Sequence, residues 1–325
     1  GTLVDESLLS DEQTVPLGAI VIHDVQHAGI AIAELSTGSF TLYDGELAQC
    51  ADELARAGVR ELIFAAPTSG DPPARITELG ATINASATPR PGWQFGQAEA
   101  VEALELQYRI GTLEGLGLDA RNPAVHAAGG IIRYLSETQA IDEQASRAPG
   151  QQHATLAHLR PPTLLRREQH CLIDRVSLRS LEIEQTIREQ SLVGSLAGVF
   201  LASPVGIRCV LHTPMGKRLV RQWLSAPLID QDAIAARHDA VESLTLGAQL
   251  REDLGEVLGN ICDLARISGR IALGRATPRD LVALGGASVQ ISALMDTIAR
   301  CDALRTHHDA LAALRDEIEP LGESI

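Results

Sequence analysis

Few residues in this chain combine the types and the spacing that catalysis needs. Asp24 and Glu34 lie in two early segments whose alternating pattern is typical of β-strands, and carboxylates on such strands can hold the two metal ions of a nuclease. No third and fourth carboxylates follow at matching positions, and a role as acidic surface residues explains both adequately. A metal-dependent nuclease therefore stays open only as an alternative function.

Phosphate, dinucleotide and metal motifs are incomplete. Met215-Gly-Lys-Arg218 contains the only lysine, but a phosphate-binding loop needs glycine at position 211, which is leucine, and serine or threonine after the lysine. Gly115-Leu-Gly117 lacks the third glycine of a dinucleotide loop. His307 and His308 are adjacent, so on a helix they point in different directions and do not share a metal. We expect no catalytic, cofactor or metal site in this chain.

The net charge is acidic and unevenly distributed. The 325 residues carry 27 Lys and Arg against 42 Asp and Glu, a formal charge of −15. Residues 1–139 hold 7 of these basic and 19 of these acidic residues, which leaves −3 for the rest of the chain. Because nucleic-acid binding depends on cationic side chains near phosphates, the first half is unsuited to broad contact with DNA. We expect it to bind protein partners instead.

Cysteine usage and hydropathy indicate the compartment. The five cysteines are odd in number and widely spaced, with no C-x-x-C motif, which favours reduced thiols. No run of eighteen apolar residues occurs, and the first residues lack the pattern of a signal peptide. The sequence therefore predicts a cytoplasmic protein without a membrane span.

One segment carries a start signal and a stop signal for a helix. Thr213 can cap the first turn, Pro214 fits the first helical position, and Pro227 prevents continuation. Large apolar residues recur along one side at helical spacing. We expect these four to form the structural core of the second half: Met215, Leu219, Trp223 and Leu224.

A second helix start follows later in the chain. Thr277 is a capping residue, Pro278 stands at the first helical position, and Asp280 can complete a pair resembling a capping box. The Gly285-Gly286 pair weakens the helix that follows by about 1 kcal/mol per glycine relative to alanine.

The patterns divide the chain into two structural classes. Strands are predicted within residues 18–44 and 61–65, helices at 46–56, 99–109 and 125–138, and a loop with at most a short helix at 67–91. From residue 164 onward the periodicity is helical. We expect an α/β domain over residues 1–139, a polar linker over 140–162 and an all-helical domain over 163–325.

Several of these segments resemble one known family. Thr213–Leu228 reads TPMGKRLVRQWLSAPL and resembles a signature of the MutS family, the DNA mismatch-recognition ATPases. Residues 1–9, Leu35–Phe40, Leu113–Gly117 and Ala127–Gln139 resemble the family's connector domain, whereas Leu172–Ile183, Ile234–Leu244, Asp263–Arg275 and Ala276–Leu281 resemble its helical core. Residues 197–212 depart from the family pattern, because the usual Leu-Asp-x-Thr link is missing.

The resemblance implies a ribonuclease-H-like connector followed by part of the helical core. The family's mismatch wedge and phosphate loop lie outside this sequence, so the chain itself is expected to be a non-catalytic scaffold coupling mismatch binding to ATP-driven change. ATP and Mg²⁺ would belong to the full-length parent, a homodimer that binds mismatched duplex DNA through other domains and meets a MutL-type matchmaker, with the connector as a candidate contact. A stand-alone protein-interaction module is the other alternative.

Overall fold

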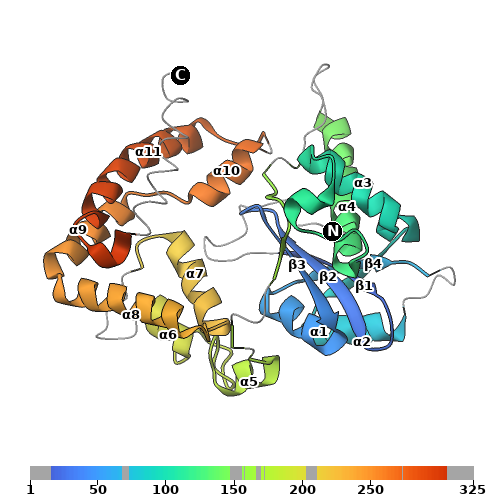
Figure 1. Cartoon of the computed structure of the whole chain (residues 1–325), viewed down its shortest axis with the longest axis horizontal. Helices are drawn as coiled ribbons and strands as arrows, with labels where there is room; N and C mark the ends of the chain where they lie inside the picture. Colours follow the sequence, from blue (N-terminus) through green and yellow to red (C-terminus); the bar gives the residue numbers. More distant parts are fainter. Residues whose placement is uncertain are drawn as a thin grey trace. The chain divides into compact units, whose positions relative to one another are not determined.

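The structure is a computed structural model that describes residues 16–67, 73–146, 156, 158–165, 170–171, 173–202, 211–272 and 274–305. It divides into two compact units, of which unit 1 comprises residues 1–165 and 268–276 and unit 2 comprises residues 166–267 and 277–325 (Figure 1). Each unit has its own hydrophobic core.

Unit 1 is built on a mixed sheet. Its elements are β1 (Leu17–Ile22), β2 (His27–Glu34), β3 (Ser39–Glu46), α1 (Leu47–Arg56), β4 (Glu61–Ala65), α2 (Ala74–Ile83), β5 (Ser86–Arg90), η2 (Gly92–Phe95), α3 (Gln97–Tyr108), η3 (Leu113–Leu116), α4 (Pro123–Ser146) and β6 (Thr163–Leu164). The strand order is β5-β4-β1-β2-β3-β6. Strands β1, β2 and β3 are antiparallel neighbours, whereas β4 and β6 run parallel to β1 and β3.

Helices cover both faces of this sheet, because its strands present apolar side chains to both sides. One layer joins Ile20, Ile30 and Phe64 to residues of α1 and α2, and the opposite layer joins Phe40 and Ile63 to residues of α3 and α4. Figure 1 shows α1 and α2 apart from α3 and α4 across the sheet. The predicted α/β class of the first half is confirmed.

The small residues at the start of α4 permit close packing. A Cβ added at Gly129 would lie 2.4 Å from Cα of Ala100 in α3, and one at Gly130 would lie 2.4 Å from the ring of Phe95. Such distances are too short for any side chain. These glycines therefore have a packing role in a helix whose interior they would otherwise weaken.

Two sequence predictions for unit 1 need correction. The segment 67–91, predicted as a loop with at most a short helix near Ala74–Leu79, contains the helix α2 at that place but also the strand β5, which was not predicted. Its prolines obscured the pattern, but Pro89 lies on β5 at the edge of the sheet, where a missing N–H is tolerated. The predicted linker 140–162 also begins inside a helix, because α4 continues to Ser146.

The end of that predicted linker is attached to unit 1. Leu156 and Leu159 are buried in the core. The carbonyl of Leu156 accepts a hydrogen bond from Nε2 of Gln107 (2.8 Å), and the carbonyl of Arg160 accepts one from the hydroxyl of Tyr108 (2.9 Å). We call Leu156 together with His158–Arg160 the strap. Because β6 then joins the sheet, unit 1 extends beyond the predicted boundary at residue 139.

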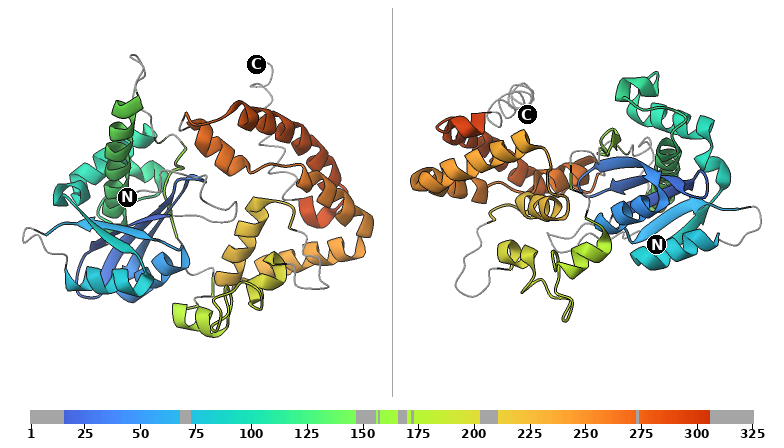
Figure 2. Two further views of the ribbon diagram at one scale, coloured as in Figure 1. Left: turned by 180° about the vertical axis from the view of Figure 1, so that it is seen from behind. Right: turned by 60° about the horizontal axis from the view of Figure 1, so that its bottom comes forward.

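Unit 2 is helical, as predicted for the second half, and its helices begin at polar caps. Its helices are α5 (Arg175–Ser180), α6 (Leu196–Leu201), α7 (Pro214–Ser225), α8 (Gln231–Leu246), α9 (Ala248–Gly259), α10 (Leu264–Ala272, grouped with unit 1 from Ser268), α11 (Pro278–Ile298) and η5 (Asp302–Leu304). Side chains of Asp174, Ser195, Thr213, Asp230 and Thr277 accept N–H groups at five of the helix starts. Figure 2 shows these helices from two further directions.

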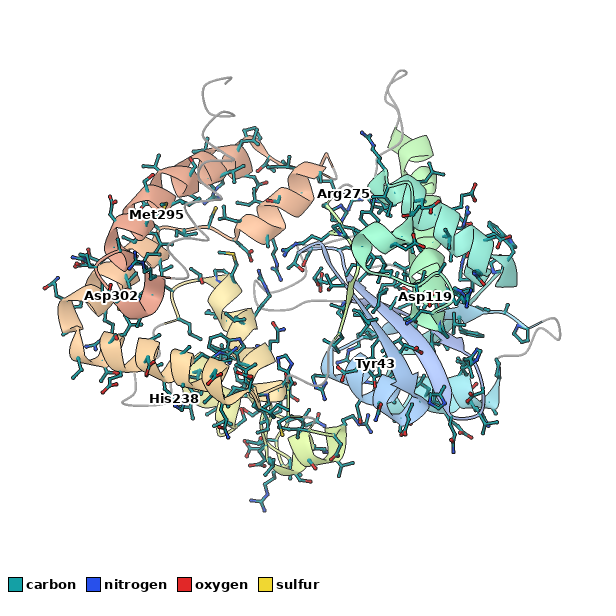
Figure 3. The ribbon with its side chains drawn as sticks, viewed as in Figure 1. Tyr43, Asp119, His238, Arg275, Met295 and Asp302 are labelled. Atoms are coloured by element: carbon teal, nitrogen blue, oxygen red, sulfur yellow. The ribbon has the colours of Figure 1, made fainter. Side chains whose placement is uncertain are left out.

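The packed core of unit 2 is small. Leu254, Ile298, Cys301 and Leu304 form it where α9 meets the end of α11 and η5. Figure 3 labels Met295 on α11 and Asp302 in η5 at this place. Among the described residues, α11 is long and apolar enough to cross a membrane by length and composition alone, with a mean hydropathy of 1.4. Since α11 also packs on α9, we interpret it as a helix of this unit.

Candidate functional site: a polar junction around helix α7

Helix α7 begins at the capping residues that the sequence indicates. The side-chain oxygen of Thr213 accepts the N–H of Gly216 at 3.0 Å, and Pro214 occupies the first turn. At α11, Thr277 and Asp280 form a reciprocal capping box with Pro278 in the first turn. Gly216 lies inside α7 with its N–H engaged by the cap, so Met215-Gly-Lys-Arg218 does not fit a nucleotide phosphate.

The middle of α7 is joined to the start of α10 by a two-pronged ion pair. Nη1 of Arg218 lies 2.6 Å from Oδ2 of Asp263, and Nη2 lies 2.8 Å from Oδ1. The two side chains are only 15% and 13% exposed. Burial raises the pKa of Asp263, but the hydrogen bonds and charge of Arg218 outweigh it, so this pKa lies below its ordinary value. The geometry suits bidentate guanidinium–carboxylate recognition.

The far end of α7 contacts α8 through an aromatic ring. The guanidinium carbon of Arg237 lies 3.7 Å from the centre of the Trp223 ring. Arg237 precedes His238, which is labelled on α8 in Figure 3. Stacking of this kind contributes about 0.5–1 kcal/mol at an exposed site.

The expectation that α7 anchors a core through its large apolar residues was wrong. Leu219 is 43% exposed and Trp223 is 41% exposed, while Met215 and Leu224 are partly buried. The one buried residue of α7 is Ser225, at the end of the helix. Helical spacing identified the apolar side of α7 correctly, but spacing cannot tell whether another element covers that side.

The beginning of α7 rests against α9. The imidazole of His212, which precedes the capping threonine, lies beside two glycines one turn apart, Gly255 and Gly259. A Cβ at Gly255 would lie 2.9 Å from Nε2 of this histidine. This contact was not predicted from the sequence, although a glycine pair at i and i+4 on one helix face was a visible signal.

These contacts place α7 at what we call the polar junction. It consists of His212, Arg218 and Trp223 together with their partners, which lie on α9, directly before α10 and on α8, respectively. The arrangement holds helices in register, because its parts are an ion pair, a stacked ring and a packed imidazole. Within the described residues, no group of three or more His, Cys, Asp or Glu side chains could hold a metal ion.

Comparison with known proteins identifies the two units. A family model for MutS domain II matches residues 16–144, and one for MutS domain III matches residues 176–324. The DNA mismatch repair protein MutS of Trichormus variabilis is 32% identical over 341 residues, which cover 100% of this chain and 36% of that protein. The chain belongs to the MutS family.

Other relatives give the same picture. The MutS proteins of Rhodopirellula baltica and of a Synechococcus strain are each 34% identical and cover 98% and 92% of this chain. The chain spans about a third of the length of these relatives, with 36% and 34% of each protein matched. Unit 1 thus contains MutS domain II, and the polar junction lies within MutS domain III.

The geometry of MutS domain II disfavours the nuclease alternative. Asp24 lies in the turn between β1 and β2, where its carboxylate accepts the N–H groups of Gln26 (2.7 Å) and His27 (2.8 Å), and these bonds lower its pKa. Glu34 ends β2 and accepts the N–H of Ser36. The strand between them is eight residues long, so the carboxylates are separated by roughly 20 Å. Two metals of one catalytic site lie about 4 Å apart.

Several predicted features lie outside the described residues. These are residues 1–9, residues 203–210 of the atypical segment 197–212, and His307 with His308. Within the atypical segment, the structure describes α6, whose last residue is Leu201, and the residues from 211 onward.

Proposed function

We propose that this chain is the connector and core portion of a MutS mismatch-repair protein and acts as a non-enzymatic scaffold. Its role would be to couple mismatch binding to ATP-driven conformational change in the whole protein. The polar junction is the observation that carries this proposal. One helix contacts three other helical segments through separate side chains, so a shift of α7 changes all three contacts together.

The parts with chemical activity would lie elsewhere in the whole protein. ATP and Mg²⁺ would bind outside this chain, and mismatched DNA would be gripped by other domains of a cytoplasmic homodimer. Unit 2 exposes large apolar residues on several helices, among them Leu219 and Trp223 on α7, Val241 on α8, and Val282 and Val289 on α11. Extended apolar exposure marks surfaces that other parts of an assembly cover. We assign that cover to the rest of the MutS chain.

The scaffold proposal is tested with the chain alone. Labelled duplexes, matched and mismatched, are titrated at low and physiological salt with Mg²⁺ or Mn²⁺ present, and ATP hydrolysis is measured in parallel. We expect binding weaker than the roughly 10⁻⁴–10⁻⁶ M of ordinary non-specific DNA-binding proteins, with no hydrolysis. Sub-micromolar affinity, a preference for the mismatch, or cleavage lost in Asp24→Asn would contradict the proposal.

Unit 1 carries a surface suited to the proposed protein partner. Trp93 is 53% exposed, and the guanidinium carbon of Arg133 lies 5.4 Å from the centre of its ring. Arg133 in turn binds the carboxylate of Glu102 (2.6 Å), and Leu106 follows one turn later on α3 with 73% exposure. Tryptophan and arginine dominate protein interfaces when they are exposed and rigidly held.

Rigidity of this surface comes from the residues beneath it. Gln94, next to Trp93, is fully buried and its Nε2 donates to Glu137 (2.5 Å), which also pairs with Arg90. We assign this Trp93–Glu102–Leu106 surface to the MutL-type matchmaker. In the full-length protein, Trp93→Ala and Glu102→Lys should weaken matchmaker binding by tenfold or more, given about 2 kcal/mol for such anchors. Val25→Ala, which alters another exposed apolar residue, on the β1–β2 turn, is the control.

A further inference from the structure

The carboxylate of Asp263 has two partners on different elements. It forms the two-pronged pair with Arg218 of α7, and its Oδ1 also accepts the backbone N–H of Arg266 in the first turn of α10 (3.4 Å). Its own carbonyl accepts the N–H of Ile267 (3.0 Å). The side chain of Asp263 therefore caps the start of α10 and also forms the ion pair with α7.

Shared use of one carboxylate couples the two helices. The fork of Arg218 fits the carboxylate in one orientation, and that orientation also directs Oδ1 toward the first turn of α10. If α7 rotates or slides, the fork no longer matches both oxygens, and the carboxylate turns away from the N–H of Arg266. An N–H at a helix start that loses its acceptor leaves that turn free to open.

The surroundings make the pair sensitive to such movement. Both side chains are largely shielded from water, so a misaligned pair is not compensated well by solvent. Arg266 places its Nε 3.8 Å from the same carboxylate, which adds positive charge on the α10 side. The carboxylate thus lies between Arg218 of α7 and Arg266 of α10. Displacement of either arginine changes the interaction of the carboxylate with the other.

We propose that Asp263 is a positioning residue that couples the placement of α7 to the closure of the first turn of α10. The inference rests on the proposed scaffold function, because it names the joint through which that scaffold would transmit a shift. It requires no ligand and is a property of this chain alone.

The test measures amide hydrogen exchange in the whole chain. Arg218→Lys keeps the positive charge but removes the fork, so it loosens the carboxylate without altering any residue of α10. We expect the amides of Arg266 and Ile267 to exchange about two- to thirtyfold faster, the range typical of coupling energies within proteins. Asp263→Asn also breaks the fork and should therefore accelerate exchange of the same two amides together with those in the middle of α7.

A matched control separates coupling from general loosening. Arg251→Lys alters an arginine of the same unit that donates instead to the carbonyl of Leu244 (2.9 Å) at the end of α8. It should leave the amides of Arg266 and Ile267 at the wild-type rate. The proposal is overturned if Arg218→Lys leaves those two amides unchanged, or if it accelerates all of unit 2 to the same extent.

A second experiment distinguishes the coupling of α7 to α10 through Asp263 from the proposed scaffold function. Arg218→Lys is introduced into a full-length MutS protein carrying this segment, and ATP-dependent release from mismatched duplex is timed. Faster exchange together with altered release supports both ideas. If the Arg266 and Ile267 amides exchange faster but release from DNA is unaltered, the coupling between α7 and α10 is supported and its role in the scaffold function is refuted. If amide exchange is unaltered, the coupling itself is refuted, whatever the release rate.

Discussion

Gly38 and His158 lie in direct contact, such that a Cβ added to Gly38 would be 2.0 Å from the carbonyl oxygen of His158. The two residues are 120 positions apart, and they join the β2–β3 turn to the strap. The N–H of Arg160 also donates to the carbonyl of Gly38 at 2.8 Å, which adds a hydrogen bond between the strap and the same turn. The strap is therefore fixed at the turn as well as at α3.

Gly38→Ala should destabilise unit 1 by about 3–4 kcal/mol, because the left-handed backbone costs about 1–2 kcal/mol and the strap must also move. Gly58→Ala is the control, since Gly58 has φ of +74° against +71° for Gly38, with nothing within 4 Å of its added Cβ. Urea denaturation measures both variants. Equal losses would mean that the strap contact contributes nothing.

A chain comprising residues 16–165 should be markedly more stable than one comprising residues 16–146. The shorter chain lacks Leu156 and Leu159 from the core and β6 from the sheet. Burial of two leucines contributes about 3–6 kcal/mol, which is a large share of the stability of such a domain. Thermal unfolding by circular dichroism compares the two. Similar melting temperatures would show that the strap is dispensable.

The stability of unit 1 should fall as the pH drops below about 6.5. Burial lowers the pKa of His158 below 6.5, so the unfolded chain takes up a proton before the folded one does. The stabilising contribution is complete above pH 6.5 and is lost as the pH falls through the folded pKa, by at most about 1.4 kcal/mol per pH unit. In urea titrations between pH 7.5 and 5, His158→Leu should flatten the pH dependence of the free energy of unfolding. An unaltered pH dependence in this variant would mean that other groups cause it.

Trp223→Ala should cost about 1–2 kcal/mol, well below the roughly 3–5 kcal/mol of a fully buried tryptophan. The ring is 41% exposed and gains part of its stability from Arg237. Arg237→Ala should itself cost up to about 1 kcal/mol through the lost stacking, and less than that when Trp223 is already replaced. Urea denaturation of both single variants and the double variant gives the coupling. A loss above 3 kcal/mol would restore a core role for this residue.

Replacing Gly285 and Gly286 together with alanine should stabilise α11 by about 1–2 kcal/mol. Both glycines lie in the continuous helix, and an added Cβ at either position meets no atom within 4 Å. Gly129→Ala is the contrasting variant, because its added Cβ would clash with Ala100. Thermal melts of the two variants should therefore shift in opposite directions. If the double variant melts lower, the helix is strained at this pair.

Sequence reasoning predicted the features that depend on neighbouring residues. The caps at Thr213 and Thr277 involve side chains and amides three residues apart, and strand alternation in residues 18–44 reflects two apolar faces. The family resemblance located both domains for the same reason, since its motifs are contiguous. The edge strand β5 was not predicted, because Pro89 within it and Pro91 directly after it remove the usual strand signal.

Relations between distant residues could not be predicted in this way. Arg218 and Asp263 are 45 positions apart, and each alone is an ordinary charged residue of a helical region. The exposure of Trp223 depends on what packs over α7, which a hydrophobic pattern does not specify. The strap looked like a linker because Pro149-Gly150 and the polar residues around it hid two buried leucines.

Each unit contains one of the two tryptophans of the chain, and each indole has an arginine at its face: Arg133 at Trp93 and Arg237 at Trp223. A phenylalanine at either position would leave a single tryptophan, in the other unit, which can be excited selectively over the tyrosines. Emission spectra of Trp93→Phe and Trp223→Phe would then follow the unfolding of MutS domains III and II separately. The chain thus carries its own optical probe for asking whether its two domains melt together or in succession.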